Sequence, residues 1–457
     1  MPGPTVPDSW FRRYRWDLLW GGLVSCLVLV AFVVPHRHLR WLTPLVPQNP
    51  GQYVPLAGTA PILGFWLPHG NWSTLCACAI AVAAVGWGPG IARRLHWRWL
   101  VVGSWLTALA WTMSLTLIDG PVRGFADRMA GSGGYLGQIP PTGGISGLLH
   151  GFTAHIAANS PHPWDLSIAG DPAGALLTFF SLNRIGLGGP AWAAALCVVV
   201  GSSSAAAVVI TVRTLGGEPM ARRVAPFVAV APLAVWVGVS ADAYFAGVAA
   251  WGLTLLALAA TRSIRFPGAV SLAAGIVLGF SVYLDYGSML MAVPALAILF
   301  VARNYRPLIG AVAGALIVVL LFAVMGFWWF DGLTLVRHRY AVGIAMARPY
   351  AYWVWANLAS LTCAIGLAGA IGLRRAFDRQ ALRDRAGLHV LLVAFVAIIA
   401  VADLSGLSKA ETERIWLPFS VWLVAAPALL PRGSHRFLIA MQVVGALAIN
   451  SLLLTRW

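Results

Sequence analysis

The sequence has few charged residues, and this excludes most soluble proteins. Asp, Glu, Lys and Arg make up 10% of the 457 residues, hydrophobic types make up 59%, and the mean hydropathy is +0.79. Soluble domains carry about 25% charged residues. A soluble enzyme, a disordered chain and a secreted disulfide scaffold are therefore excluded. The composition predicts an all-α polytopic membrane protein with one integral membrane domain, 1–457.

Lysine and cysteine are also scarce. Lys409 is the single lysine among 31 basic residues, so the formal net charge of +16 rests on arginine. The arginines lie in short clusters between apolar runs, where they orient a membrane protein, and no nucleic acid partner is expected. The five cysteines lie inside apolar runs without zinc-site spacing, so no disulfide framework or structural zinc is expected.

Soluble catalytic motifs and a signal cleavage site are absent from the sequence. We find no phosphate loop, nucleophile elbow, zinc-protease motif or dinucleotide glycine pattern, so ATP-driven work is not expected. No small-residue cleavage site closes the first apolar run, at 18–34, which we interpret as a retained signal anchor.

Apolar runs of about 20 residues, the length that spans a bilayer, predict about 13 transmembrane helices. An inner N-terminus places 20 of the 31 basic residues but only five of the fifteen acids inside, as the positive-inside rule requires. Two pairs of neighbouring spans are expected to form tight hairpins, namely 224–240 with 243–261 and 268–284 with 286–302. The predicted spans are 18–35, 71–88, 99–118, 191–212, 224–240, 243–261, 268–284, 286–302, 308–329, 351–373, 388–402, 415–430 and 437–455.

This topology divides the chain into an N-terminal hairpin of spans (1–98), a long outer loop (119–190) and the remaining transmembrane bundle (191–457). The outer loop contains an amphipathic piece from Ala175 to Arg184, too short to span, which predicts a helix lying along the membrane surface. Asp171 is expected to cap this helix, with Pro172 as its first residue. Since function concentrates in loops on a rigid scaffold, we expect the working site on the outer face.

Ionisable residues are absent from the expected midplane and gather at the outer helix ends, which points to a site beside the outer leaflet. Sugar transfer from a polyprenyl-phosphate donor suits such a site. It needs a carboxylate that accepts the acceptor's proton and cations that stabilise the departing phosphate. The lipid phosphate is a leaving group of low basicity, so no general acid is required.

Asp119, at the outer end of the third span, is the first candidate for the base, although it also suits a helix-end cap. Asp127, followed by Arg128, is the second candidate, and a surface ion pair is the competing interpretation. Asp242 lies in an outer hairpin, where turn chemistry alone would explain it. Asp285, before Tyr286, is similar.

Two basic sets are candidates for holding the phosphate. The first is Arg337-His338-Arg339 with Arg348, for which contact with lipid headgroups is the alternative. In the second, Arg414 would grip the phosphate while Glu413 orients it, and Glu411 lies beside them; a helix-start cap with an ion pair is the alternative. His155 and His162 are candidates for binding the acceptor. No cofactor is expected. These histidines could hold a divalent cation together with Asp165, but their spacing matches no metal template.

Four stretches resemble membrane glycosyltransferases of the GT-C architecture, particularly actinobacterial members that use decaprenyl-phosphate sugars. They include methylthioxylose, mannosyl and arabinofuranosyl transferases of lipoarabinomannan. The similar stretches are Ala169-Gly170-Asp171-Pro172-Ala173-Gly174-Ala175-Leu176-Leu177, which looks like a His-Pro-Pro-Gly-x-x-Leu motif, Arg184-Ile185-Gly186-Leu187-Gly188-Gly189-Pro190, Ala241-Asp242-Ala243 and Glu413-Arg414-Ile415-Trp416-Leu417.

The resemblance implies an inverting glycosyltransferase of the plasma membrane that acts on an extracytoplasmic glycan or lipoglycan. Asp171 and Ala173 replace residues of the family motif, and the first outer loop, 36–70, contains no acid. We therefore interpret the first two spans as an added hairpin and 119–190 as the equivalent of the family's first outer loop. A flippase for lipid-linked sugars and a non-catalytic assembly subunit are the alternatives.

Overall fold

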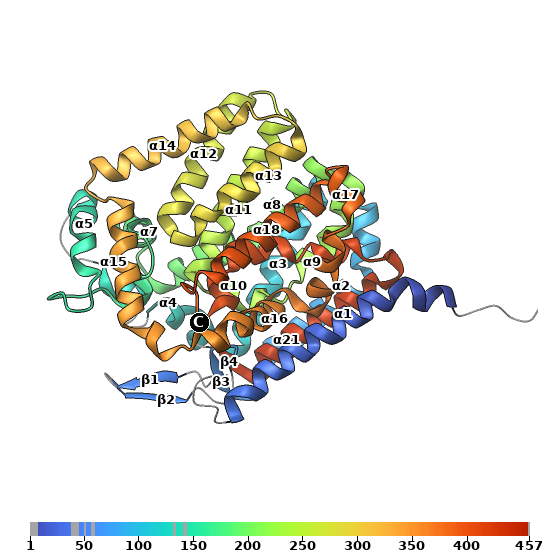
Figure 1. Ribbon diagram of the computed structural model, residues 1–457, viewed down its shortest axis with the longest axis horizontal. Helices are drawn as coiled ribbons and strands as arrows, with labels where there is room; N and C mark the ends of the chain where they lie inside the picture. The colour runs from blue at the N-terminus through green and yellow to red at the C-terminus, as the bar shows by residue number, and fades with distance from the viewer. Residues whose placement is uncertain are drawn as a thin grey trace, which may run out of the picture.

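The computed structural model describes residues 8–37, 45–49, 52–55, 60–130, 134–139 and 144–455. These residues form a helical bundle with two small sheets (Figure 1). Ten helices in the described ranges are long and apolar enough to span a membrane, which confirms the all-α polytopic fold. They are α1 (Asp8–Val33), α2 (Trp72–Arg94), α3 (Trp97–Thr116), α8 (Pro190–Gly216), α11 (Ala241–Ala260), α12 (Pro267–Leu284), α14 (Pro307–Val324), α16 (Tyr350–Ala376), α18 (Gly387–Leu404) and α21 (His435–Leu452).

Three of the predicted spans fall on shorter helices, so the number thirteen stays a prediction. Hydropathy measures how apolar a segment is and not whether its helix is continuous. Each of the three segments contains proline, which lacks the N–H donor that a continuous helix needs. Span 224–240 covers α9 (Glu218–Ala229) and α10 (Ala234–Val237); span 286–302 covers η6 (Tyr286–Met291) and α13 (Ala292–Ala302); span 415–430 covers α19 (Thr412–Ile415), α20 (Leu417–Leu423) and η8 (Ala426–Leu429).

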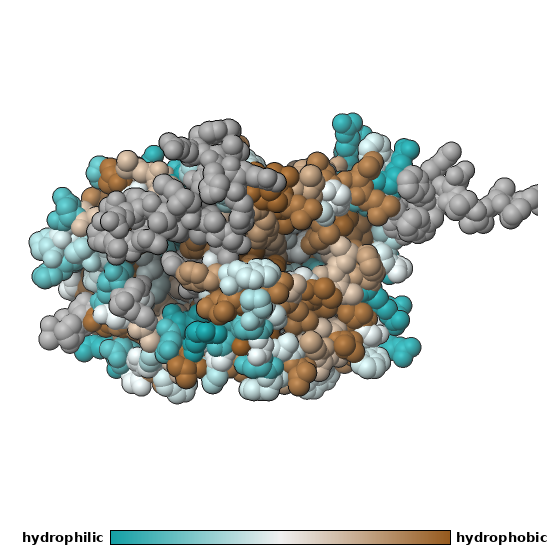
Figure 2. Space-filling view, turned by 90° about the horizontal axis from the view of Figure 1, so that it is seen from below, coloured by the Kyte–Doolittle hydropathy of each residue, from teal (hydrophilic) through white to brown (hydrophobic). Residues whose placement is uncertain are grey.

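The connecting elements gather at the two ends of the bundle (Figure 1). α5, α7 and α15 lie at the end predicted to be outside, and α17 lies at the opposite end. An apolar belt covers the middle and right of one face, with hydrophilic residues toward both ends (Figure 2). The connecting helices are α4 (Asp127–Ala130), α5 (Ile145–Gly151), α6 (Leu166–Ala169), α7 (Ala173–Arg184), α15 (Trp329–Val342) and α17 (Arg379–Arg383).

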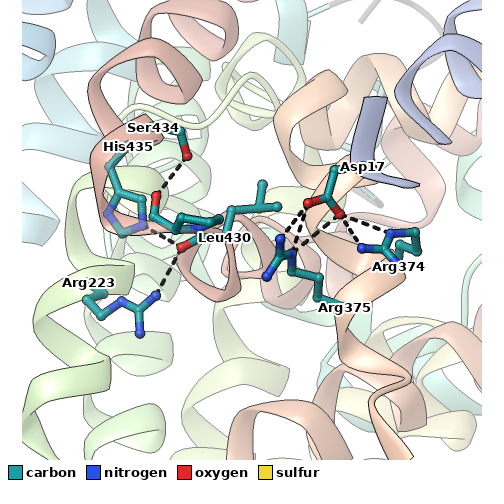
Figure 3. Close-up of polar contacts among 8 residues, drawn as sticks. Asp17, Arg223, Arg374, Arg375, Leu430, Ser434 and His435 are labelled. Carbon is teal, nitrogen blue, oxygen red and sulfur yellow. Dashed lines mark hydrogen bonds and ion pairs between the residues drawn. The ribbon is translucent and has the colours of Figure 1, made fainter. Parts of the chain in front are cut away.

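Polar contacts at the predicted inner end join segments that the charge distribution assigns to the same side (Figure 3). The buried carboxylate of Asp17, on α1, binds Arg374 and Arg375, on α16, at 2.5 Å each. Arg223 Nη2 donates to the carbonyl oxygen of Leu430 at 3.0 Å. Each contact joins segments that are far apart in sequence but that the predicted topology places on the inner side. The contacts therefore support the predicted alternation of sides.

At the opposite end, β3 (Gly64–Trp66) pairs antiparallel with β4 (Leu453–Thr455), and β1 (Leu45–Asn49) pairs with β2 (Gln52–Pro55). The predicted helix of the outer loop is present as α7. It buries Leu176, Phe179 and Phe180 against the protein, while its last residues are exposed. The prediction that Asp171 caps this helix is wrong, because no side chain caps α7 and the Asp171 carboxyl binds another residue.

Close helix packing positions the outer ends of the spans. A Cβ atom on Gly275 of α12 would lie 1.9 Å from the carbonyl oxygen of Ala311 on α14, so only glycine permits this approach. Gly201 of α8 approaches Ala243 of α11 in the same way, at 2.7 Å between Cβ positions. Small residues at such contacts let membrane helices pack backbone to backbone. The outer end of α11, which carries Asp242, is thereby held in place.

Candidate functional site

Asp119, the first candidate base, lies in a buried ion pair cluster at the end of α3, in η2 (Leu117–Asp119). Its Oδ1 contacts His69 Nε2 at 2.5 Å, and its Oδ2 accepts from Arg128 Nη2 at 2.6 Å. Arg128 therefore pairs with Asp119 and not with its neighbour Asp127, which is exposed at the start of α4. Each carboxylate oxygen of Asp119 is already engaged by a nitrogen donor.

His69 joins this cluster to the backbone. Its Nε2 faces the carboxylate of Asp119, and its Nδ1 faces the carbonyl oxygen of Leu67 at 2.6 Å. The ring is thereby held between Asp119 and the chain at Leu67.

Arg414 is the centre of a second cluster, which joins segments distant in sequence. Its Nη1 donates to Asp242 Oδ2 at 2.5 Å, and its Nη2 donates to Glu411 Oε2 at 3.0 Å. The other oxygen of Glu411 accepts from Arg348 Nη2 at 2.5 Å. Burial opposes the charge of Arg414, yet the carboxylates of Asp242 and Glu411 hold its pKa above the ordinary value. The cluster is thus an alternating chain of two arginines and two acids.

Glu411 and Glu413 have different roles from those expected. Burial acts to raise the pKa of Glu411, but Arg348 and Arg414 outweigh it and hold that pKa below its ordinary value. Glu413 is fully buried, and its carboxyl accepts hydrogen bonds from Ser360 Oγ at 2.5 Å and Leu63 N at 3.0 Å. The residue that orients Arg414 is therefore Glu411, whereas the sequence had suggested Glu413.

Two further acids lie within electrostatic reach of Asp242. Burial, and then the charges of Asp242 and Asp285, raise the pKa of Asp171 well above its ordinary value. Its carboxyl accepts a hydrogen bond from the buried hydroxyl of Tyr135. Burial raises the pKa of Asp285 to about 6, although Gly287 N and Ser288 Oγ donate to its oxygens. Asp171, Asp242 and Asp285 therefore form one acid cluster, which we call the Arg414 acid cluster because Arg414 binds Asp242.

A cavity of about 590 Å³ lies between α15, the turn after it and the segment 406–409. Arg348 links it to Glu411, because its Nη1 donates to the carbonyl oxygen of Lys409 at 2.6 Å and its Nη2 binds Glu411. Arg337, His338 and Lys409 supply the basic side chains of its wall, and Leu407 and Met346 supply apolar ones. Tyr340, also in the wall, accepts a hydrogen bond from Lys409 N at 3.0 Å. The structure thus brings Arg337 and His338 of the predicted phosphate set to a single hollow.

The remaining predicted site residues lie elsewhere. Arg339 Nη1 donates to the carbonyl oxygen of Ile156 at 2.6 Å and is not among the cavity-lining residues. His155 Nδ1 donates to the carbonyl oxygen of His162 at 2.7 Å, while the side chain of His162 is exposed. Among the described residues, no three His, Cys, Asp or Glu side chains are grouped so as to hold a metal ion. A role for His155 and His162 in acceptor binding stays a prediction.

The sequence reasoning did not place Lys409 or Asp171 in the site. Lys409 lies in the outer segment 403–414 and is the single lysine of the chain, a signal that could have drawn attention to it. Asp171 was explained as a helix cap, because Asp before Pro is common at helix starts. Burial raises its pKa most, and the charges of Asp242 and Asp285 add to this; no local pattern reveals that burial or that proximity.

Comparisons with known proteins give a weak likeness in backbone only. No protein-family profile matches the chain, and no curated protein sequence matches it. Two solved structures are similar. One is the crystal structure of the Archaeoglobus fulgidus oligosaccharyltransferase in complex with Zn and sulfate, with 15% identity, a TM-score of 0.49 and coverage of 78% of this chain and 53% of that chain. The other is the archaeal oligosaccharyltransferase AglB from Archaeoglobus fulgidus in complex with an inhibitory peptide and a dolichol-phosphate, with 12% identity, a TM-score of 0.46 and coverage of 78% and 56%.

The chain spans about half the length of these two proteins. A likeness this loose carries no inference about activity. The functional argument therefore rests on the side chains of this protein.

Proposed function

We propose that this protein is a membrane glycosyltransferase of the GT-C type that transfers a sugar from a polyprenyl monophosphate to an acceptor hydroxyl outside the membrane. The motif resemblance supports decaprenyl phosphate as the carrier and a cell-envelope lipoglycan, such as lipoarabinomannan, as the acceptor. The distribution of charged residues supports a plasma membrane location with the site on the extracytoplasmic side.

The observation that carries the proposal is a continuous line of contacts from the basic cavity to the Arg414 acid cluster. Arg348 Nη1 donates to the carbonyl oxygen of Lys409, which lines the cavity, and its Nη2 binds Glu411. Glu411 in turn binds Arg414, which binds Asp242. The line ends at Asp242, whose charge acts on Asp285. Cations for a phosphate are therefore linked through this framework to a carboxylate that could accept the proton of a hydroxyl.

This arrangement suits an inverting displacement. The acceptor oxygen forms a bond to the anomeric carbon while the bond from that carbon to the phosphate oxygen breaks, and the lipid phosphate leaves with the electron pair. Arg337 and Lys409 would stabilise the phosphate charge as it develops. The acceptor proton must pass to a carboxylate whose pKa lies near the working pH.

Asp285, in the Arg414 acid cluster, meets that requirement. Its pKa of about 6 leaves it largely ionised at pH 7 yet more basic than an exposed carboxylate. Asp119, which the sequence favours as the base, is held by His69 and Arg128 and suits an ion pair that fixes the end of α3. We therefore assign the base to Asp285 and the anchoring role to Asp119.

The surface around the cavity suits a lipid substrate. Leu407 and Met346 in the cavity wall are exposed, and so are Leu404 and Val342 beside them in the sequence. Leu404 ends α18, one of the helices able to span the membrane. An apolar strip next to basic side chains matches a prenyl chain that carries a phosphate at its end.

The test is transfer by purified protein from labelled polyprenyl-phosphate sugars to an envelope glycan. We expect transfer by the wild type and a loss of roughly 10²–10⁴ in rate for Asp285→Asn, because the base is removed. Asp331→Asn, which changes an exposed acid on α15, is the matched control and should transfer normally.

Three outcomes would contradict parts of the proposal. Loss of activity in Asp119→Asn with normal transfer by Asp285→Asn would return the base role to Asp119. Movement of the lipid-linked sugar across sealed vesicles, without transfer, would favour the flippase. Absence of both activities in folded protein would favour an assembly subunit.

A further inference from the structure

Two backbone interruptions meet inside the helical bundle, away from the Arg414 acid cluster. α16 is broken at Gly366, whose φ of 75° and ψ of 156° are not helical. The chain between α9 and α10, residues 230–233, is also non-helical, and all four residues are buried. A Cβ atom on Gly366 would lie 2.9 Å from Pro232 Cγ, so the two breaks touch. Non-helical backbone at membrane depth is tolerated where protein or water satisfies its polar groups.

An unpartnered amide lies at the same place. Gln442 of α21 is fully buried, and its Cγ would lie 3.3 Å from a Cβ atom on Gly366. Neither its Oε1 nor its Nε2 has a hydrogen-bond partner among the described residues. A primary amide has two N–H donors and an oxygen with two lone pairs, and leaving them unmade in an apolar interior is costly.

A small cavity lies against the 230–233 segment. Its volume is about 20 Å³, and its wall includes Ala231 and Leu233 together with the hydroxyl residues Thr112, Ser202 and Ser204. A cavity of roughly 10–15 Å³ or more holds one water molecule when polar partners surround it. The break between α9 and α10 thus lies against a cavity that carries three hydroxyl side chains among small and apolar ones. On its other side, Pro232 of this break contacts the break in α16 next to the buried amide.

We propose that these breaks form an internal water-binding site, in which ordered water bonds the amide of Gln442 and occupies the cavity beside Ser202 and Ser204. The occupant is neutral, because no residue lining the cavity is ionisable and Pro232 and Gly366 supply no charge. A bare cation without a carboxylate would be expensive at this depth. The site is independent of the proposed transfer reaction.

The first test replaces the amide by an apolar side chain of similar length. If water satisfies Gln442, Gln442→Met removes a partner from that water and should lower the melting temperature in detergent by about 2–4 °C. A dry site predicts the opposite, because removing an unsatisfied amide leaves stability unchanged or increases it. Asn450→Leu, on the same helix, is the matched control: its amide donates directly to Leu115 O, so it should destabilise whether or not water is bound.

The second test needs no variant and detects the water itself. Radiolysis of bound water generates hydroxyl radicals that oxidise adjacent side chains, which mass spectrometry locates. We expect oxidation at Pro232 and at the buried Trp111, which lines the cavity. Tyr352, equally buried, donates its hydroxyl hydrogen to the carbonyl oxygen of Ala31 at 2.9 Å and is the internal control. Oxidation of Pro232 and Trp111 no greater than that of Tyr352 would overturn the proposal. A stability change that depends on sodium rather than choline chloride would replace water with a cation and overturn it as well.

Discussion

At the scale of single residues, the acids at the outer end differ chiefly in whether a cation accompanies them. Glu411 contacts Arg348 and Arg414, and Asp119 contacts Arg128, whereas among the described residues Asp285 accepts from the neutral donors Gly287 N and Ser288 Oγ. Burial without a counter-charge raises a carboxyl pKa, and a paired cation lowers it. The same residue type can therefore anchor a helix end in one place and, in the proposed reaction, accept a proton in another.

Asp285 should make the protein less stable as pH rises through the weakly acidic range. The unfolded carboxyl ionises near 3.8 and the folded one near 6, so between these values the unfolded state loses its proton first. The contribution of Asp285 to the free energy of unfolding should fall from about pH 4 to about pH 6 and stay constant above. Chemical denaturation of the wild type and Asp285→Asn at several pH values measures this. Parallel pH profiles for the two proteins would contradict the assignment.

Removing Arg414 should destabilise the fold more than removing another buried arginine contact. Arg414→Met leaves Asp242 and Glu411 without their shared cation, and breaking such a pair costs about 3–5 kcal/mol. Arg339→Met removes the donor to one backbone carbonyl, which should cost about 1–3 kcal/mol. Thermal unfolding in detergent compares the two. Equal losses would show that Arg414 and its acids contribute no special stabilisation.

At the scale of helices, hydropathy located the long continuous spans but not the interrupted ones. Segment 224–240 is apolar enough to resemble a span, yet its helix is interrupted at 230–233, where Pro232 cannot donate a hydrogen bond.

The site was predictable from the sequence only in part. Arg414 and Asp242 were singled out separately, but they are 172 residues apart, and their contact follows from how α11 and α19 pack. Patterns within one segment carry no information about such a contact.

The break in α16 gives a test at this scale. Gly366→Ala adds a Cβ atom to a residue whose φ is 75°, and this atom would lie 2.9 Å from Pro232 Cγ. The backbone strain should lower the free energy of unfolding by about 1–3 kcal/mol. Gly445→Ala is the matched control. A Cβ atom at this position would meet no neighbouring heavy atom within 4 Å beyond its own helix backbone and its chain neighbours, and alanine favours a helix. Equilibrium unfolding of both variants decides this, and a Gly366→Ala protein as stable as the wild type would show that α16 can run unbroken.

At the scale of the whole molecule, charge and contacts give the same division into two ends. Asp17, Arg374 and Arg375 meet at the arginine-rich end, whereas the Arg414 acid cluster and the basic cavity lie at the end that holds most acids. Positive residues stay on the inner side of a membrane during insertion. The proposed reaction needs the opposite end to face outward, so the orientation of the molecule links the fold to the function.

That orientation is open to a direct test. In a background in which the five cysteines are replaced by alanine, we introduce Asp331→Cys on α15 and, separately, Arg379→Cys on α17, both at exposed positions. A membrane-impermeant maleimide should label the first protein in intact cells and the second only after the membrane is opened, because the arginine-rich end faces inward. The reverse pattern would place the cavity and the Arg414 acid cluster in the cytoplasm. A polyprenyl-phosphate sugar presented at the outer leaflet would then never reach Asp285, and the proposed transfer would have to be given up even if the structure of the site were unchanged.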